Sequence, residues 1–217
     1  MQVSIQNPYD KNSKIFILFD PTHLLKCISN NFRNKEAFIC PSFVDGASDE
    51  RAKLTYPNFS HLKYVMDIEL GKPVKIAHKL TDKVVNPLSL EKTNVSIADA
   101  VFHESTITAL KEYGKNGEDG KDGITPFLDT AEFLERVRDW WDRFNVKSKD
   151  KGHHKRKEQM KPINKDNAKE FATSMEKFVA WLTLWFKSYP GYCISSPTYK
   201  ALVQTCTATI YLCYYLL

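Results

Sequence analysis

The sequence lacks the cysteine pairs that disulfide frameworks and structural zinc sites need. It has five cysteines, an odd number, and no C-x-x-C pair. This pattern favours reduced thiols and an intracellular protein. Residues 1–10 are too polar for a signal peptide, and the apolar run 208–217 is far shorter than the roughly 20 residues of a transmembrane helix. We therefore expect no membrane association, and the run is read as a core helix or strand.

Two common ligand-binding motifs are also missing from the glycine-containing stretch 116–123, NGEDGKDG. A Walker A loop needs Ser or Thr after its Gly-Lys pair, but Lys121 is followed by Asp122. An EF-hand loop that began at Glu118 would need a glutamate where Asp129 stands. The stretch is therefore predicted to be a solvated loop.

The positive charge is concentrated in one segment. The chain has 217 residues, 42% of them hydrophobic, a composition typical of one large or two small globular domains. Its net charge is +5, and residues 146–165 alone contain eight basic and two acidic side chains, a net charge of +6. This segment is either a solvated linker or a surface for nucleic-acid phosphates. The candidate phosphate contacts are Lys147, Lys149, Lys151, Lys155, Arg156 and Lys157.

A strand followed by a helix is predicted near the start of the chain. The continuous apolar run 15–19, IFILF, is typical of a strand buried on both faces. Asp20 follows it, and Pro21 suits the first turn of a helix. Apolar side chains then recur at helical spacing: Leu24, Leu25, Ile28 and Phe32. Asp20 is thus either the N-cap of this helix or a carboxylate at a strand end, where α/β enzymes place metal ligands and acids.

The remaining chain is predicted to be mainly helical. Residues 36–44 fit a strand or an extended connection. Helical periodicity and capping residues predict helices over 60–70, 94–113, 130–144, 167–186 and 197 to about 206. Trp140 is expected to be a core residue, and Cys206 and Cys213 are expected to be buried on one helix face.

Three segments resemble P-element-type DNA transposases and the THAP-domain proteins derived from them. Residues 20–32, DPTHLLKCISNNF, are similar to D-x-x-H-L-[LI]-K-x-x-R-N-N-[FLW], with Ser29 where the family often has arginine. Residues 79–103, KLTDKVVNPLSLEKTNVSIADAVFH, are similar to KLTxKHVNPxxFxKMxVKxAxQVFS. Residues 130–146, TAEFLERVRDWWDRFNV, are similar to T-x-x-F-[IL]-x-x-x-x-x-[FW]-[FW]-D-x-x-N.

The resemblance implies a mainly α fold, in which a helical GTP-binding insertion is flanked by fragments of an α/β RNase H-like domain. Residues 1–35 would be the first fragment, 36–188 the insertion and 189–217 the truncated return. Asp20 matches the family's second catalytic carboxylate, a ligand of Mg²⁺ in a complete site. The other carboxylates would fall before and after this sequence, so we expect it to be catalytically incomplete by itself.

The resemblance also implies a GTP site. Lys79 would neutralise phosphate, Val95 would line the nucleotide and Trp141 would stack on the base. Asp142 would accept hydrogen bonds from N1–H and the exocyclic amine of guanine, a donor pair that adenine lacks. Asn145 would add a hydrogen bond from the same helix face.

Two positions of the implied GTP site depart from the family pattern, because Asn94 replaces a lysine and His103 replaces a serine. The resemblance further implies a nuclear location and DNA as a partner, and it leaves a homo-oligomer open. Two alternatives also stay open. One is an interaction module that has lost nucleotide binding and contacts nucleic acid through the basic segment. The other is a partial sequence of an active transposase.

Overall fold

The computed structural model describes residues 2–43, 53–115, 126–146, 148–150, 152–153 and 157–217. These parts of the chain are mainly helical. The α-helices are α1 (Pro21–Lys35), α2 (Ser60–Ile68), α3 (Asp82–Val85), α4 (Val95–Val101), α5 (Glu104–Lys115), α6 (Phe127–Phe144), α8 (Ala168–Ser188) and α9 (Ser196–Leu216). Two short 3₁₀ helices are η1 (Glu91–Thr93) and η2 (Glu158–Met160). The mainly α prediction is confirmed.

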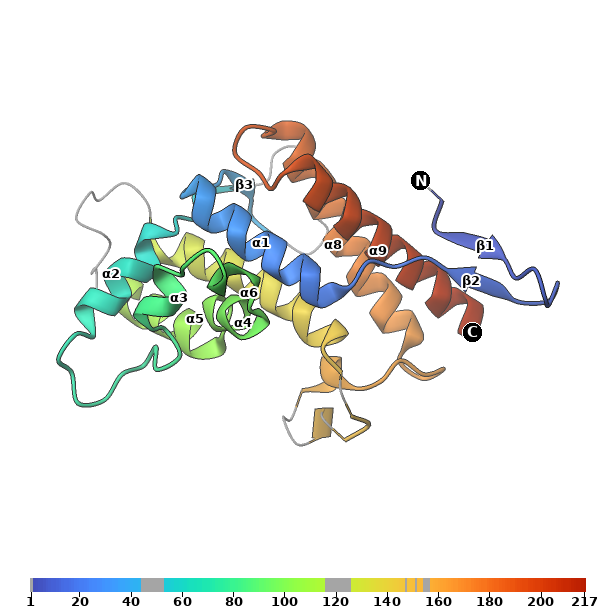
Figure 1. Ribbon diagram of the computed structural model, residues 1–217, viewed down its shortest axis with the longest axis horizontal. Coiled ribbons are helices and arrows are strands. Elements are labelled where there is room, and N and C mark those ends of the chain that lie inside the picture. The colour runs from blue at the N-terminus through green and yellow to red at the C-terminus, as the bar shows by residue number, and fades with distance from the viewer. Residues whose placement is uncertain (1, 44–52, 116–125, 147, 151, 154–156) are drawn as a thin grey trace.

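The described strands form two small antiparallel sheets. β1 (Ser4–Gln6) pairs with β2 (Lys14–Phe16), and β3 (Cys40–Pro41) pairs with β4 (Leu54–Thr55). The β1–β2 hairpin lies beside the C-terminal part of α9, at one end of the molecule (Figure 1). The described residues therefore contain no extended sheet.

The long helices connect two groups of elements. α8 and α9 run side by side, whereas α2, α3, α4 and α5 gather at the other end (Figure 1). α6 packs against α5 in one group and contacts α8 in the other, and α1 contacts both α4 and α9. These contacts bring α4, α5 and α6 together, and the candidate site lies among them.

An aromatic core joins the helices. The fully buried Phe32 of α1 has its ring centroid 5.2 Å from that of Phe38, 5.4 Å from that of Phe59 and 5.0 Å from that of Phe133. Close contacts of this kind stabilise a core beyond the area that they bury. The indole N–H of Trp181 donates to the carbonyl oxygen of Pro41 at 2.7 Å, which ties α8 to β3.

The start of the chain confirms one prediction and contradicts another. α1 begins at Pro21 and buries all four predicted core residues, and the Asp20 carboxylate accepts a hydrogen bond from the backbone N–H of Thr22 at 2.9 Å. Asp20 is therefore the N-cap. The strand buried on both faces was wrong, because β2 ends at Phe16 and the apolar side chains of 15 and 17–19 are between 38% and 45% exposed. Among the described residues β2 pairs only with β1, and its contact with α9 through Phe16 and Tyr215 does not bury both of its faces.

The helix predicted over 94–113 is two helices. The Asn94 side chain caps α4 by accepting from the N–H of Ser96, and α4 ends at Val101. His103 Nδ1 then accepts from the N–H of Ser105 at 3.1 Å, in the manner of an N-cap for α5. The cap at His103 thus marks a break within one apolar pattern that periodicity does not reveal.

The other helices differ from prediction mainly at their ends. α6 begins at Phe127, three residues before Thr130, and α9 continues to Leu216. Cys206 and Cys213 are buried on α9 and Trp140 is buried on α6, as predicted. The loop predicted at 116–123 lies outside the described residues. Within the described ranges, no helix combines the length and apolar character needed to cross a bilayer.

Candidate functional site

The candidate site is built around a buried carboxylate on α6. Asp142 has no exposed surface, although it lies near the C-terminal end of this amphipathic helix. Arg138, one turn earlier, places Nε 2.9 Å from Asp142 Oδ1. Lys157 places Nζ 2.5 Å from Asp142 Oδ2 and donates a hydrogen bond to it. A carboxylate removed from water needs such compensation, so these two cations explain how Asp142 is tolerated inside the fold.

Lys157 also pairs with Glu104, the first residue of α5. Burial by itself lowers the pKa of Lys157, but hydrogen bonds to Asp142 and Glu104 outweigh burial and raise that pKa. The same hydrogen bond from Lys157 lowers the pKa of the Glu104 carboxyl. The charged forms of this pair are therefore favoured at neutral pH.

A second acid links α4 to α6. Asp99 Oδ1 accepts a hydrogen bond from the indole Nε1–H of Trp141 at 2.8 Å and another from Arg138 Nη1 at 3.0 Å. Trp141 is only 2% exposed, so its ring is covered in this conformation. Arg138 thus contacts both acids, and a chain of side chains runs from Asp99 through Arg138 to Asp142 and Lys157.

One acceptor in this chain of side chains has no hydrogen bond within the described part of the protein. Asp142 Oδ1 and Arg138 Nε are both buried, and their 2.9 Å contact is an ion pair whose angles do not suit a hydrogen bond. Oδ1 therefore keeps unused acceptor capacity. A buried acceptor in this state is a place where a donor from a ligand can bind favourably.

A cavity of about 510 Å³ lies against this group. Its charged lining includes Glu104, Lys111, Glu135, Arg138, Asp142 and Lys157, and these come from α5, α6 and the residue before η2. The volume is within the range of small-molecule sites, roughly 300–1,000 Å³. The Asp142 carboxylate is thus buried at the wall of a space that could receive a ligand.

The turn before α3 is held close to the same helices. The buried Glu69 carboxylate accepts from the backbone N–H groups of Ile76 and Ala77 and from the hydroxyl of Tyr113 on α5. This fixes the turn that carries His78, whose ring centroid is 5.6 Å from that of His103. Burial first, and then the positive charge of Arg138, lower the pKa of His103. The turn therefore lies, through His103, near Asp99 and Arg138 in the chain of side chains.

The residues predicted from the sequence fall into two groups. Trp141, Asp142 and Lys157 come together as described above. Lys79 is an exposed side chain next to His78, and Val95 is the half-buried first residue of α4. Within the described ranges neither is joined to Asp142 by a hydrogen bond or ion pair. Asn145 ends α6 as its C-cap residue, with its N–H bonded to the carbonyl of Trp141.

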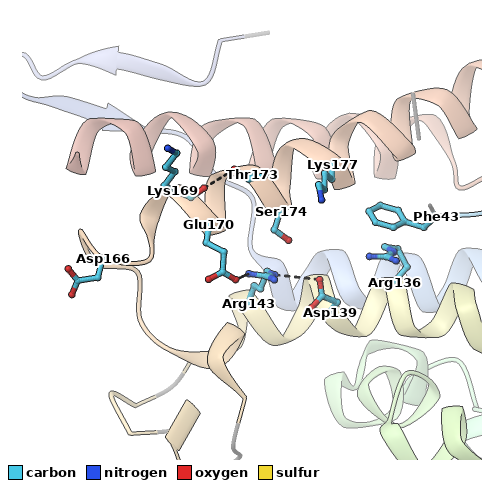
Figure 2. A pocket seen from close by; sticks show the side chains of 10 residues that line it. All are labelled: Phe43, Arg136, Asp139, Arg143, Asp166, Lys169, Glu170, Thr173, Ser174 and Lys177. Atoms are coloured by element: carbon cyan, nitrogen blue, oxygen red, sulfur yellow. Dashed lines mark hydrogen bonds and ion pairs between the residues drawn. The ribbon is translucent and has the colours of Figure 1, made fainter. Parts of the chain in front are cut away.

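A different cavity, of about 640 Å³, opens between α6 and α8 (Figure 2). Arg143 lies between Asp139, at 3.4 Å, and Glu170, at 3.9 Å, and the guanidinium of Arg136 lies over the ring of Phe43. None of the predicted site residues lines this cavity. None of its charged lining residues is buried, whereas Asp142 is, so it is a weaker candidate than the cavity at Asp142.

Comparison with known proteins gives this arrangement a context. No protein-family model matches the sequence. The transposable element P transposase of Drosophila melanogaster is 27% identical over 141 residues, which is 65% of this chain and 16% of that protein. The chain is related to P element transposase.

A solved structure shares the fold. The chain matches a structure described as the Drosophila P element transposase strand transfer complex with a TM-score of 0.75 and 19% identity. The match covers 99% of this chain and 43% of that chain. This chain therefore spans less than half of the structure that it matches and about a sixth of the curated P element transposase.

The catalytic and nucleic-acid positions suggested by the resemblance to P element transposases do not form a site among the described residues. Asp20 is exposed, it caps α1, and the hydrogen bond from the hydroxyl of Thr22 lowers its pKa. The described residues contain no group of three acidic, histidine or cysteine side chains placed to hold a metal ion. Lys149 is exposed, whereas the remaining nucleic-acid candidates, Lys147, Lys151, Lys155 and Arg156, lie outside the described residues.

Sequence reasoning missed three members of the site: Asp99, Arg138 and Glu104. Arg138 had a usable signal, because it lies four residues before Asp142 and such pairs meet on one helix face. Asp99 and Glu104 had none, since their contacts depend on how α4 and α5 pack against α6 and on where residue 157 lies.

Proposed function

We propose that this chain binds GTP and serves as the nucleotide-binding part of a transposase of the P element type. The relationship to P element transposase supports the transposase assignment. The observation that carries the nucleotide proposal is the Asp142 carboxylate, fully buried at a cavity of about 510 Å³ with one oxygen that lacks a hydrogen bond among the described residues.

The chemistry favours guanine over adenine. A carboxylate has two acceptor oxygens and can receive both N1–H and the exocyclic amine of guanine, whereas the adenine edge offers no such pair of donors. Asp142 is held on a long helix, and Arg138 supplies a counter-charge on the side away from Lys157. Arg138 therefore places a positive charge beside the carboxylate while neutral donors of the base approach it.

The other proposed contacts come from three separate places in the fold. The exposed ammonium of Lys79, on the turn fixed by Glu69, is available to phosphate, and Val95 and Asn145 lie at the ends of α4 and α6. The hydrogen bond from Trp141 to Asp99 orders the α4 side. Stacking of a base on Trp141 requires its ring to turn out of its covered position.

Isothermal titration with GTP and ATP tests the nucleotide proposal. We expect binding of GTP, no binding of ATP, and loss of GTP binding in Asp142→Asn. The asparagine presents one donor and one acceptor, so this variant should instead bind xanthosine triphosphate, whose base has an oxygen in place of the guanine amine. Asp139→Asn is the matched control, because it removes an acid from the same helix and the same cavity. Absence of heat with GTP, or equal affinity for ATP, would contradict the proposal.

We also propose a DNA contact through the basic segment 146–165, where Lys149 is exposed. Binding to duplex DNA should weaken steeply with salt, because phosphate contacts release counterions.

We propose that these 217 residues alone do not transfer DNA strands, since Asp20 acts as a helix cap. Mg²⁺-dependent strand transfer by the purified chain would refute this. The division at residues 35 and 188, the nuclear location and a homo-oligomer stay predictions.

A further inference from the structure

The Asp142 carboxylate is not free to receive a base in this structure. Lys157 donates to Oδ2 at 2.5 Å, so one of the two acceptors that guanine would use is already occupied. A base that used both oxygens must first displace this ammonium. The affinity for the nucleotide then depends on how firmly Lys157 is held.

The two cations at Asp142 differ in how easily they can leave. Arg138 is on the same helix, its side chain is 15% exposed, and it also donates to Asp99. Lys157 lies outside α6, on the segment that leads into η2. It also pairs with Glu104, whose side chain is 57% exposed. When Lys157 leaves Asp142 it can keep Glu104 as a partner at the edge of the cavity. Arg138 is thus the permanent counter-ion, and Lys157 is the displaceable one.

Local packing aims Lys157 at Asp142. η2 packs against α6, and Met160 at its end is buried. The backbone N–H of Lys157 donates to the carbonyl of Gly152 at 2.9 Å. A Cβ atom at Gly152 would lie 3.0 Å from the Lys157 carbonyl oxygen and 2.8 Å from Lys161 Cγ, so any other residue there would force these neighbours to shift. The segment is therefore built to hold the lysine where it contacts the acid.

We propose that Lys157 is an affinity-determining residue of the nucleotide site, an internal cation that occupies the base-reading carboxylate Asp142 and is displaced when guanine binds. This inference rests on the proposed function. It assigns Lys157 a role opposite to that of a phosphate ligand. Removing the charge of a phosphate ligand weakens nucleotide binding, whereas removing the charge of Lys157 frees Asp142 and strengthens it.

Titration of GTP into Lys157→Met and Lys161→Met tests the proposal. Lys161 lies in the same segment and pairs with Glu158 outside the cavity at Asp142, so its variant matches the change in charge and size. We expect Lys157→Met to bind GTP about tenfold more tightly than the unaltered chain, equivalent to about 1.4 kcal/mol. Lys161→Met should bind as the unaltered chain does.

The outcomes separate the two proposals. If the unaltered chain binds GTP and Lys157→Met binds equally or more weakly, the internal-cation role is overturned and the proposed function stands. If neither binds GTP, the proposed function fails and the role of Lys157 fails with it. If Lys157→Met does not fold, hydrogen exchange of the unaltered chain tests the same proposal without a substitution. Saturating GTP should speed exchange of amides 157–161, and unchanged or slower exchange there would overturn the proposal.

Discussion

Replacing Asp99 with Ala removes the side chain that joins α4 to α6. Its Oδ1 accepts hydrogen bonds from Trp141 Nε1 at 2.8 Å and from Arg138 Nη1 at 3.0 Å. In Asp99→Ala the indole N–H of Trp141 stays buried and loses its acceptor. The substitution therefore tests whether the chain of side chains at the candidate site stabilises the fold.

The magnitude follows from burial. A buried donor left without a partner costs roughly 1–3 kcal/mol. The ion pair to Arg138 adds at most about 1 kcal/mol, because Asp99 is partly exposed and water screens it. We expect a loss of about 2–3 kcal/mol in the free energy of unfolding. For a chain of this length each kcal/mol lowers the melting temperature by roughly 2–4 °C, so the shift should be about 4–12 °C.

Urea unfolding followed by far-ultraviolet circular dichroism measures this loss, and Asp99→Asn is the control. The asparagine keeps an acceptor for Trp141 and loses only the charge, so it should cost about 1 kcal/mol or less. A double-mutant cycle of Asp99→Ala with Trp141→Phe should show a coupling energy of about 1 kcal/mol or more. Equal stabilities of the alanine and asparagine variants, or a coupling energy near zero, would refute the reasoning.

Three further predictions test other parts of the fold. Phe32→Ala should cost about 3–5 kcal/mol in urea unfolding because it empties the aromatic core, whereas Tyr9→Ala, at a fully exposed ring, should change stability by less than about 0.5 kcal/mol. Glu69→Gln weakens the charge-assisted hydrogen bonds to the turn 76–77, and hydrogen exchange of those amides should become faster. The lowered pKa of His103 means that the folded state favours the neutral ring, so stability should be full above pH ~6.5 and fall as pH drops through the folded pKa. His103→Gln should lose less stability than the unaltered chain between pH ~7 and ~5.

Local patterns predicted the helices well and their breaks poorly. The spacing from Leu24 to Phe32 placed the buried face of α1, because helical period and burial are linked within a few residues. The break at His103 was missed, since a histidine cap depends on the backbone around it and not on apolar spacing. The strand at 15–19 was wrong because an apolar run shows only what a segment could bury, and its neighbours decide what it does bury.

The amino-acid sequence by itself determined the helical character of the chain, the start of α1 at Pro21 and the resemblance that singled out Asp142. Each of these depends on residues within a few positions of one another. Only the tertiary structure decided that Asp142 is buried and paired with Lys157. Lys157 is fifteen residues away along the chain, and the packing of η2 against α6 brings its ammonium to the carboxylate. No local pattern records such a contact, because the chain must fold back before the two charges can meet.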